Sequence, residues 1–177
     1  MSKIKIISGK YASRLINCPK NQATHPMGNR ERQALFNQLG NDFSGLNVLD
    51  AFAGTGALGI EALSRGASSV DFLEKDREAL KTLAHSLADL QIKSARLIQK
   101  ADQLTTYKLI FIDPPYHNFQ LPLVKRIITH LAPSGLLIVS HPANITVDDL
   151  IEPHLELLSS RTYAAARISI FRAKPQS

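Results

Sequence analysis

Residues Asp113-Pro114-Pro115-Tyr116 place a carboxylate, two prolines and an aromatic ring directly after an apolar run at 109–112. Proline has no amide hydrogen, so nearby carbonyl groups stay free to accept a hydrogen bond beside the carboxylate of Asp113. Asp113 and the Pro114 carbonyl would hold both N–H bonds of an exocyclic base amine and localise its lone pair toward a methyl donor. Tyr116 is placed to stack on the base. The segment therefore predicts a catalytic site for methyl transfer; a plain turn at the end of a strand is the alternative.

A glycine pattern, G-x-G-x-x-G, lies between an expected strand at 48–52 and an expected helix at 57–64. Backbone amides at Gly54, Gly56 and Gly59 can approach a cofactor because no Cβ stands in the way. Glu74 lies about 20 residues beyond the first glycine, where a carboxylate accepts hydrogen bonds from the two hydroxyls of a ribose. These features predict a nucleoside cofactor. The alternative is that the glycines serve tight packing and Glu74 caps a helix.

Asp50 distinguishes between the cofactors that such a loop accepts. A carboxylate before the glycines repels a pyrophosphate but suits S-adenosylmethionine (AdoMet), whose amino-acid end is cationic. Phe52 belongs to the same predicted site, and Asp102 is placed to reach the adenine amine unless it is an exposed loop residue. We predict AdoMet as cofactor, S-adenosylhomocysteine as product and no metal, since Cys18 and the histidines form no ligand pattern.

Positive charge is concentrated at the start of the chain. The first 30 of the 177 residues carry six lysines and arginines and no acidic residue, and the formal net charge is +6. A polarised charge of this kind is typical of a polyanionic partner. A solvated basic arm without a partner is the alternative. The predicted nucleic-acid contacts are Lys3, Lys5, Lys10, Arg14, Arg30 and Arg32.

Composition and pattern indicate a globular α/β protein. Hydrophobic residues make up 44% and charged residues 20% of the chain, which excludes a disordered or collagen-like class. A single cysteine and the lack of a signal-peptide core or a run of roughly 18 apolar residues lead us to expect a soluble, cytoplasmic monomer without membrane association.

Strands and helices are expected to alternate along most of the chain, which predicts a Rossmann-like, mostly parallel sheet with an antiparallel C-terminal edge. We divide the chain into a basic arm or hairpin at 1–28, for RNA binding, and a methyltransferase domain at 29–177. Asn29 and Gly40 are the expected caps of the first helix. The expected strands are 4–8, 13–16, 48–52, 70–73, 95–99, 109–112, 136–139, 155–158 and 168–171, and the expected helices are 29–39, 57–64, 76–90 and 121–131.

The chain resembles the RsmD family, the class I bacterial 16S ribosomal RNA guanine-N2 methyltransferases. The resemblance lies in residues 7–11, 14–15, 30–37, 48–67 and 113–116 and covers nearly the whole length. It implies a seven-stranded sheet with a short N-terminal β-hairpin extension. It also implies AdoMet-dependent methylation of the exocyclic N2 amine of one guanine in 16S (small-subunit) rRNA, presented on an assembled or assembling subunit.

Two positions depart from the family pattern. His25-Pro26-Met27 stands where the family usually has Arg-Pro-Thr, and Ser140 stands near a frequent glutamate. Three other functions stay open. A DNA adenine-N6 or cytosine-N4 methyltransferase shares the chemistry of 113–116 but usually carries a target-recognition region for which this chain has no room. An NAD-linked oxidoreductase leaves 113–116 without a role. A catalytically silent RNA-binding or ribosome-assembly module would bind RNA without AdoMet.

Overall fold

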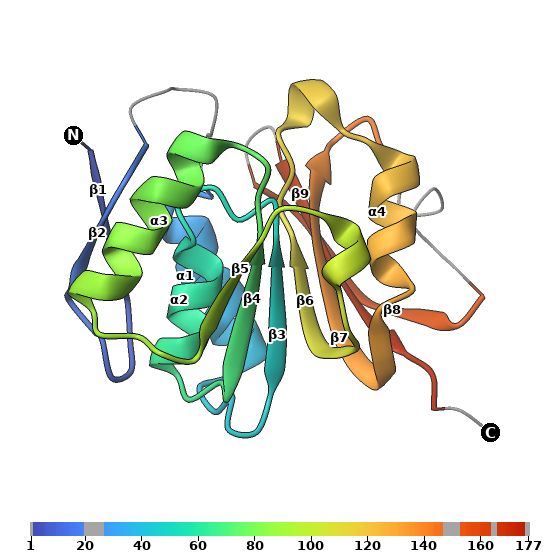
Figure 1. Ribbon diagram of the computed structural model, residues 1–177. Helices are drawn as coiled ribbons and strands as arrows, with labels where there is room; N and C mark the ends of the chain where they lie inside the picture. The colour runs from blue at the N-terminus through green and yellow to red at the C-terminus, as the bar shows by residue number, and fades with distance from the viewer. Residues whose placement is uncertain (1, 20–26, 147–152, 164–165, 176–177) are drawn as a thin grey trace.

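The computed structural model describes residues 2–19, 27–146, 153–163 and 166–175 (Figure 1). In chain order the elements are β1 (Lys3–Lys5), β2 (Leu15–Asn17), α1 (Asn29–Leu39), β3 (Asn47–Ala51), α2 (Ala57–Ser64), β4 (Ser69–Leu73), α3 (Arg77–Asp89), β5 (Ala95–Ile98), the 3-10 turn η1 (Ala101–Gln103), β6 (Tyr107–Ile112), the 3-10 turn η2 (Tyr116–Asn118), α4 (Leu121–Ile128), β7 (Leu131–Pro142), β8 (Leu155–Tyr163) and β9 (Ala166–Ala173).

Seven strands form the main sheet in the order β5-β4-β3-β6-β7-β9-β8. The first five of these strands pair in parallel, and β9 pairs antiparallel with both β7 and β8. The predicted Rossmann-like fold with an antiparallel edge is confirmed. The strand order reverses direction between β3 and β6, and in open α/β sheets this switch point is where the carboxyl ends of the strands leave a crevice for ligands.

Helices cover both faces of the sheet (Figure 1). The core on one face joins α1, α2, α3 and the hairpin β1–β2 to the sheet, and the core on the other face contains the buried residues of α4. The strand β6 is apolar and buried along nearly its whole length, as expected for a central parallel strand covered on both sides. Among the described residues, no helix is long and apolar enough to cross a membrane.

The helices at 29–39 and 57–64 have the predicted bounds, whereas several other bounds differ: β1 ends at Lys5 and α4 at Ile128, and β7, β8 and β9 are longer than expected. Gly28, not Asn29, is the N-cap of α1, because its carbonyl accepts the first helical hydrogen bond, from the Arg32 amide at 2.9 Å. The side chain of Asn29 accepts from the guanidinium of Arg32 and caps no amide. The strand β7 extends beyond the expected 136–139 at both ends. A register shift between Tyr107 and Leu109 lets Leu131 pair with β6, and residues 140–142 pair with β9. Such a bulge leaves no clear signal in the hydrophobic pattern.

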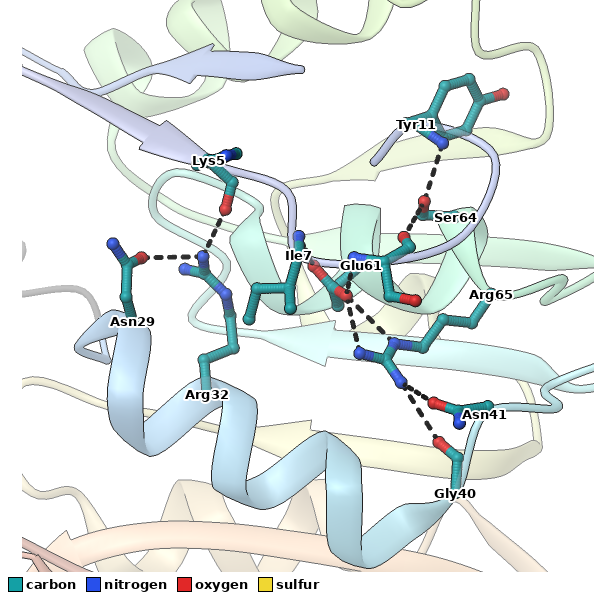
Figure 2. A network of polar contacts seen from close by, with 11 residues as sticks. Lys5, Ile7, Tyr11, Asn29, Arg32, Gly40, Asn41, Glu61, Ser64 and Arg65 are labelled. Atoms are coloured by element: carbon teal, nitrogen blue, oxygen red, sulfur yellow. Dashed lines mark hydrogen bonds and ion pairs between the residues drawn. The ribbon is translucent and has the colours of Figure 1, made fainter. Parts of the chain in front are cut away.

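The hairpin is tied to the body of the protein by a polar network on α2 (Figure 2). The buried carboxylate of Glu61 accepts hydrogen bonds from the amides of Ile7 at 2.8 Å and Ser8 at 3.0 Å. The hydroxyl of Ser64 accepts from the amide of Tyr11 at 2.9 Å. Apolar side chains of the hairpin also lie in the main core. The described part of the hairpin therefore packs as a fixed element, while its separate role in RNA binding stays a prediction.

Candidate active site

A pocket of about 550 Å³ opens at the carboxyl ends of β3, β4 and β6. Phe52 and Gly54 reach it from the turn after β3, Glu74 follows β4, and Asp113 and Tyr116 follow β6. Parallel strands end at the same edge of a sheet, so three segments far apart in the sequence meet there. The structure thus brings four of the seven predicted cofactor residues, Asp50, Phe52, Gly54 and Glu74, into one pocket with the predicted catalytic segment.

Two of the three predicted glycines lie behind the pocket rather than in it. Gly54 lines the cavity, whereas Gly56 and Gly59 are not among the lining residues. A Cβ on Gly56 would come within 2.4 Å of the Leu83 side chain, and one on Gly59 within 2.4 Å of the Phe72 ring. Gly56 also has a φ of 73°, which favours glycine. The tight-packing alternative therefore describes these two glycines, which let the loop and α2 lie close to the sheet.

Asp50 is 2% exposed and holds the segment after the glycine loop by a buried hydrogen bond. Its Oδ2 accepts a hydrogen bond of 2.8 Å from the amide of Gly59. Burial raises the pKa of Asp50 well above its ordinary value, against the hydrogen bond from Gly59, and the nearby carboxylates of Asp113 and Glu74 raise it further. A cation entering this end of the pocket would relieve that repulsion, and a pyrophosphate would increase it. The acidic lining therefore fits AdoMet better than a dinucleotide.

Glu74 holds the entrance of the loop in place. Its Oε2 accepts from the amide of Gly54 at 2.8 Å, and its Oε1 accepts from the amides of Lys75 and Asp76. Asp76, rather than Glu74, caps α3, since its side chain accepts from the amide of Ala79. Each carboxylate oxygen has further lone pairs. Glu74 can therefore accept hydrogen bonds from a ribose and keep its hydrogen bond from the Gly54 amide.

Asp102 is not part of the pocket. It is exposed on η1, while its neighbours Gln99 and Ala101 line the cavity. The prediction that Asp102 reaches the adenine amine is not supported by its place in the structure. Gln99 was missed because the sequence placed it inside the expected strand at 95–99, whereas β5 ends at Ile98, and because it carries no charge that marks it as a ligand-binding side chain.

The catalytic segment forms one wall of the pocket. Asp113 and the prolines Pro114 and Pro115 all line it, and Tyr116 beside them is 37% exposed. Burial raises the pKa of Asp113 to about 6, although the Ser140 hydroxyl and the Met27 amide, as hydrogen-bond donors, act in the opposite direction. The phenol of Tyr116 is hydrogen-bonded to the hydroxyl of Ser140. Ser140, which the sequence marked only as a departure from the family, thus touches this wall.

Five of the six residues predicted to contact nucleic acid are exposed: Lys3, Lys5, Lys10, Arg14 and Arg30. Arg32 is fully buried, so the prediction that it presents its charge to a phosphate is wrong. Its Nη2 donates to the Lys5 carbonyl at 2.6 Å and to Asn29 Oδ1 at 2.9 Å (Figure 2). The reason is helical spacing, because Leu35 and Phe36, three and four residues further on, share its inward face. Burial lowers the pKa of Arg32, and Glu61 opposes that shift.

The chain is similar to known proteins over nearly its whole length. The family model described as "Conserved hypothetical protein 95" matches residues 4–172. The Bacillus subtilis protein "Putative rRNA methyltransferase YlbH" is 28% identical over 188 aligned residues, which cover 97% of this chain and 100% of that protein. "Ribosomal RNA small subunit methyltransferase D" of Buchnera aphidicola subsp. Acyrthosiphon pisum is 37% identical over 137 residues, 73% of this chain and 70% of that one.

A solved structure has the same fold. "Putative methyltransferase yhhF from Escherichia coli" superposes with a TM-score of 0.86 at 26% identity and covers 99% of this chain and 100% of that one. The match of the family model, the Buchnera relative and this superposition agree with the pocket at the switch point of the sheet. The chain belongs to the RsmD family of methyltransferases.

Proposed function

We propose that this protein transfers a methyl group from AdoMet to the exocyclic N2 amine of a guanine in 16S (small-subunit) rRNA. The observation that carries the proposal is the meeting of Asp113 and Pro114 with the glycine loop and Glu74 in one pocket. Relatives named for methylation of small-subunit rRNA support the substrate class. An assembled or assembling small subunit is the expected form of the substrate.

The residues of the pocket account for cofactor binding. Gly54, Phe52 and Glu74 would hold the nucleoside end of AdoMet, and Asp50 would favour its cationic amino-acid end. When bound, AdoMet supplies a methyl group on a positively charged sulfur. No residue of the pocket has to form a covalent bond to the methyl group, because the amine of the substrate accepts it directly.

Asp113 and the carbonyl of Pro114 act on the amine. They accept one hydrogen bond each from its two N–H groups and direct its lone pair toward the methyl carbon. Transfer would form the new N–C bond and break the S–C bond of AdoMet, whose electron pair would stay on the sulfur. The proton lost by the methylated amine passes to Asp113 or to water. A pKa of about 6 leaves Asp113 ionised at neutral pH and therefore able to accept both the hydrogen bond and the proton.

Exposed basic residues of the hairpin are expected to contact RNA phosphates. Replacement of Lys3 and Lys5 by Ala should reduce the slope of log affinity against log salt by about 1.4 to 1.8, since each phosphate contact contributes roughly 0.7 to 0.9. Fluorescence anisotropy with an rRNA fragment at several salt concentrations measures this slope. Replacement of the exposed Lys174, at the other end of the chain, is the matched control. An unchanged slope in the double variant would show that Lys3 and Lys5 do not contact RNA phosphates.

Tritiated methyl transfer tests the function itself. The substrates are small ribosomal subunits from a strain that lacks its own enzyme, followed by nucleoside analysis, with duplex DNA in parallel. N2-methylguanosine in the subunit rRNA is the expected product. Label on DNA alone would establish the DNA methyltransferase alternative. RNA binding without AdoMet binding or methyl transfer would instead establish a catalytically silent module.

A further inference from the structure

We infer that Ser140 is a positioning residue of the active site, whose hydroxyl joins the phenol of Tyr116 to the carboxylate of Asp113. Ser140 is 1% exposed on β7, and its Oγ is hydrogen-bonded to the Tyr116 hydroxyl. The register of β6 and β7 pairs Ile112 with Val139, so Ser140 lies beside Asp113, the next residue after β6. From this position its hydroxyl can donate to the Asp113 carboxylate. β7 lies next to β6 in the sheet, so the link runs from one strand to the segment that follows the other. The inference rests on the proposed function only in taking Asp113 as the acceptor of the substrate amine.

The direction of the hydrogen bonds follows from the chemistry of the three groups. An ionised carboxylate only accepts, so Ser140 donates its one proton to Asp113. The Ser140 oxygen then accepts from Tyr116. Burial raises the pKa of the Tyr116 phenol above its usual value, so the phenol keeps its proton at neutral pH and acts as the donor. The chain of donors therefore runs from Tyr116 through Ser140 to Asp113.

This series of hydrogen bonds has two consequences for the wall of the pocket. The aromatic ring, 37% exposed, is tied at its far end and keeps one orientation toward a stacked base. The Asp113 carboxylate is oriented by the Ser140 hydroxyl, and its remaining lone pairs stay available for the substrate amine. Positioning of this kind favours the geometry for reaction before the base arrives.

Other charged groups surround Asp113, and they set the background for its titration. Asp50 on β3 and Glu74 after β4 line the same pocket, and the carboxylates of Asp113 and Glu74 both act on Asp50. Glu31 on α1 acts on Tyr116 together with Asp113. Arg32, also on α1, borders the same pocket. None of these groups changes when the Ser140 hydroxyl is removed, so a change in the titration of Asp113 reports on that hydroxyl.

The test combines an NMR titration with kinetics. The carboxyl carbon of Asp113 is followed by NMR in protein labelled with ¹³C-aspartate, and Asp113→Asn assigns its signal. Ser140→Ala should raise the midpoint of this titration by about one pH unit, because a hydrogen bond to the charged form is lost. The acidic limb of kcat against pH should move by the same amount. At pH 7 kcat should fall about twofold, because the ionised fraction of Asp113 is roughly halved when its midpoint moves from about 6 to about 7.

Three variants separate positioning from a general loss of structure. Ser169→Ala removes a buried hydroxyl on the neighbouring β9 that bonds to His141, and it should leave the limb in place. Tyr116→Phe keeps the ring and the hydrogen bond from Ser140 to Asp113. It should therefore lower kcat but hardly shift the midpoint of the Asp113 titration. Ser140→Thr keeps the hydroxyl and should restore the midpoint.

An unshifted Asp113 signal in Ser140→Ala, or an equal shift in Ser169→Ala, would overturn the inference. The NMR result does not depend on methyl transfer. A shifted signal in a protein that methylates no RNA would therefore support the link and reject the proposed function. Normal methylation with an unshifted signal would support the proposed function and reject the link.

Discussion

Asp113→Asn is expected to lower the kcat of methyl transfer about a thousandfold while AdoMet still binds. Asn keeps the size of the side chain and one acceptor oxygen, but it replaces the carboxylate with a neutral amide that cannot take up the proton of the amine. Loss of one group that stabilises developing charge costs roughly a hundredfold to a thousandfold, and loss of proton transfer adds to that. Single-turnover methyl transfer and AdoMet calorimetry measure the two effects separately.

The stability of Asp113→Asn should move in the opposite direction to its activity. Burial raises the pKa of Asp113 to about 6, so the folded protein ionises this carboxyl less readily than the unfolded chain does. The free energy of unfolding therefore falls as the pH rises from about 4 to about 6 and stays lower above that range. A neutral Asn avoids that cost, and the melting temperature at pH 7 should rise. Asp102→Asn, an exposed aspartate outside the pocket, is the matched control and should change neither property. An active Asp113→Asn protein would contradict the mechanism.

Glu61→Ala should destabilise the protein by about 3 to 5 kcal/mol, the usual cost of removing one partner of a buried ion pair. Glu61 and Arg65 are 0% and 2% exposed at their side chains, and they are 3.0 Å apart. The substitution also leaves the amides of Ile7 and Ser8 without their acceptor. Chemical denaturation in urea measures the free energy of unfolding.

The expected loss is specific to this buried network (Figure 2). Glu156→Ala removes an exposed glutamate on β8 and should change the free energy of unfolding by less than about 0.5 kcal/mol. Arg32 is also affected in Glu61→Ala, because Glu61 is the charged group that favours its guanidinium. A loss below about 1 kcal/mol would mean that the hairpin is not anchored through Glu61.

Contiguous features of the chain were predictable from the sequence. The helices at 29–39 and 57–64 follow from local apolar spacing and from Gly40 and Gly66 beyond their ends. The segment 113–116 and the loop at 50–54 carry their chemistry in neighbouring residues. Their meeting was also predictable in outline, because alternating strands and helices imply a parallel sheet whose carboxyl ends share one edge.

Only the tertiary structure decided which face each side chain turns to and which distant residues meet. Arg32 has the charge of an RNA ligand but lies inward with Leu35, and Asp102 lies outside a pocket that its neighbours line. Glu61 meets Ile7 across 54 positions of the chain, and Ser140 meets Tyr116 across 24. The physical reason is that burial and hydrogen-bond partners depend on packing between elements, whereas propensity, capping and spacing act within one.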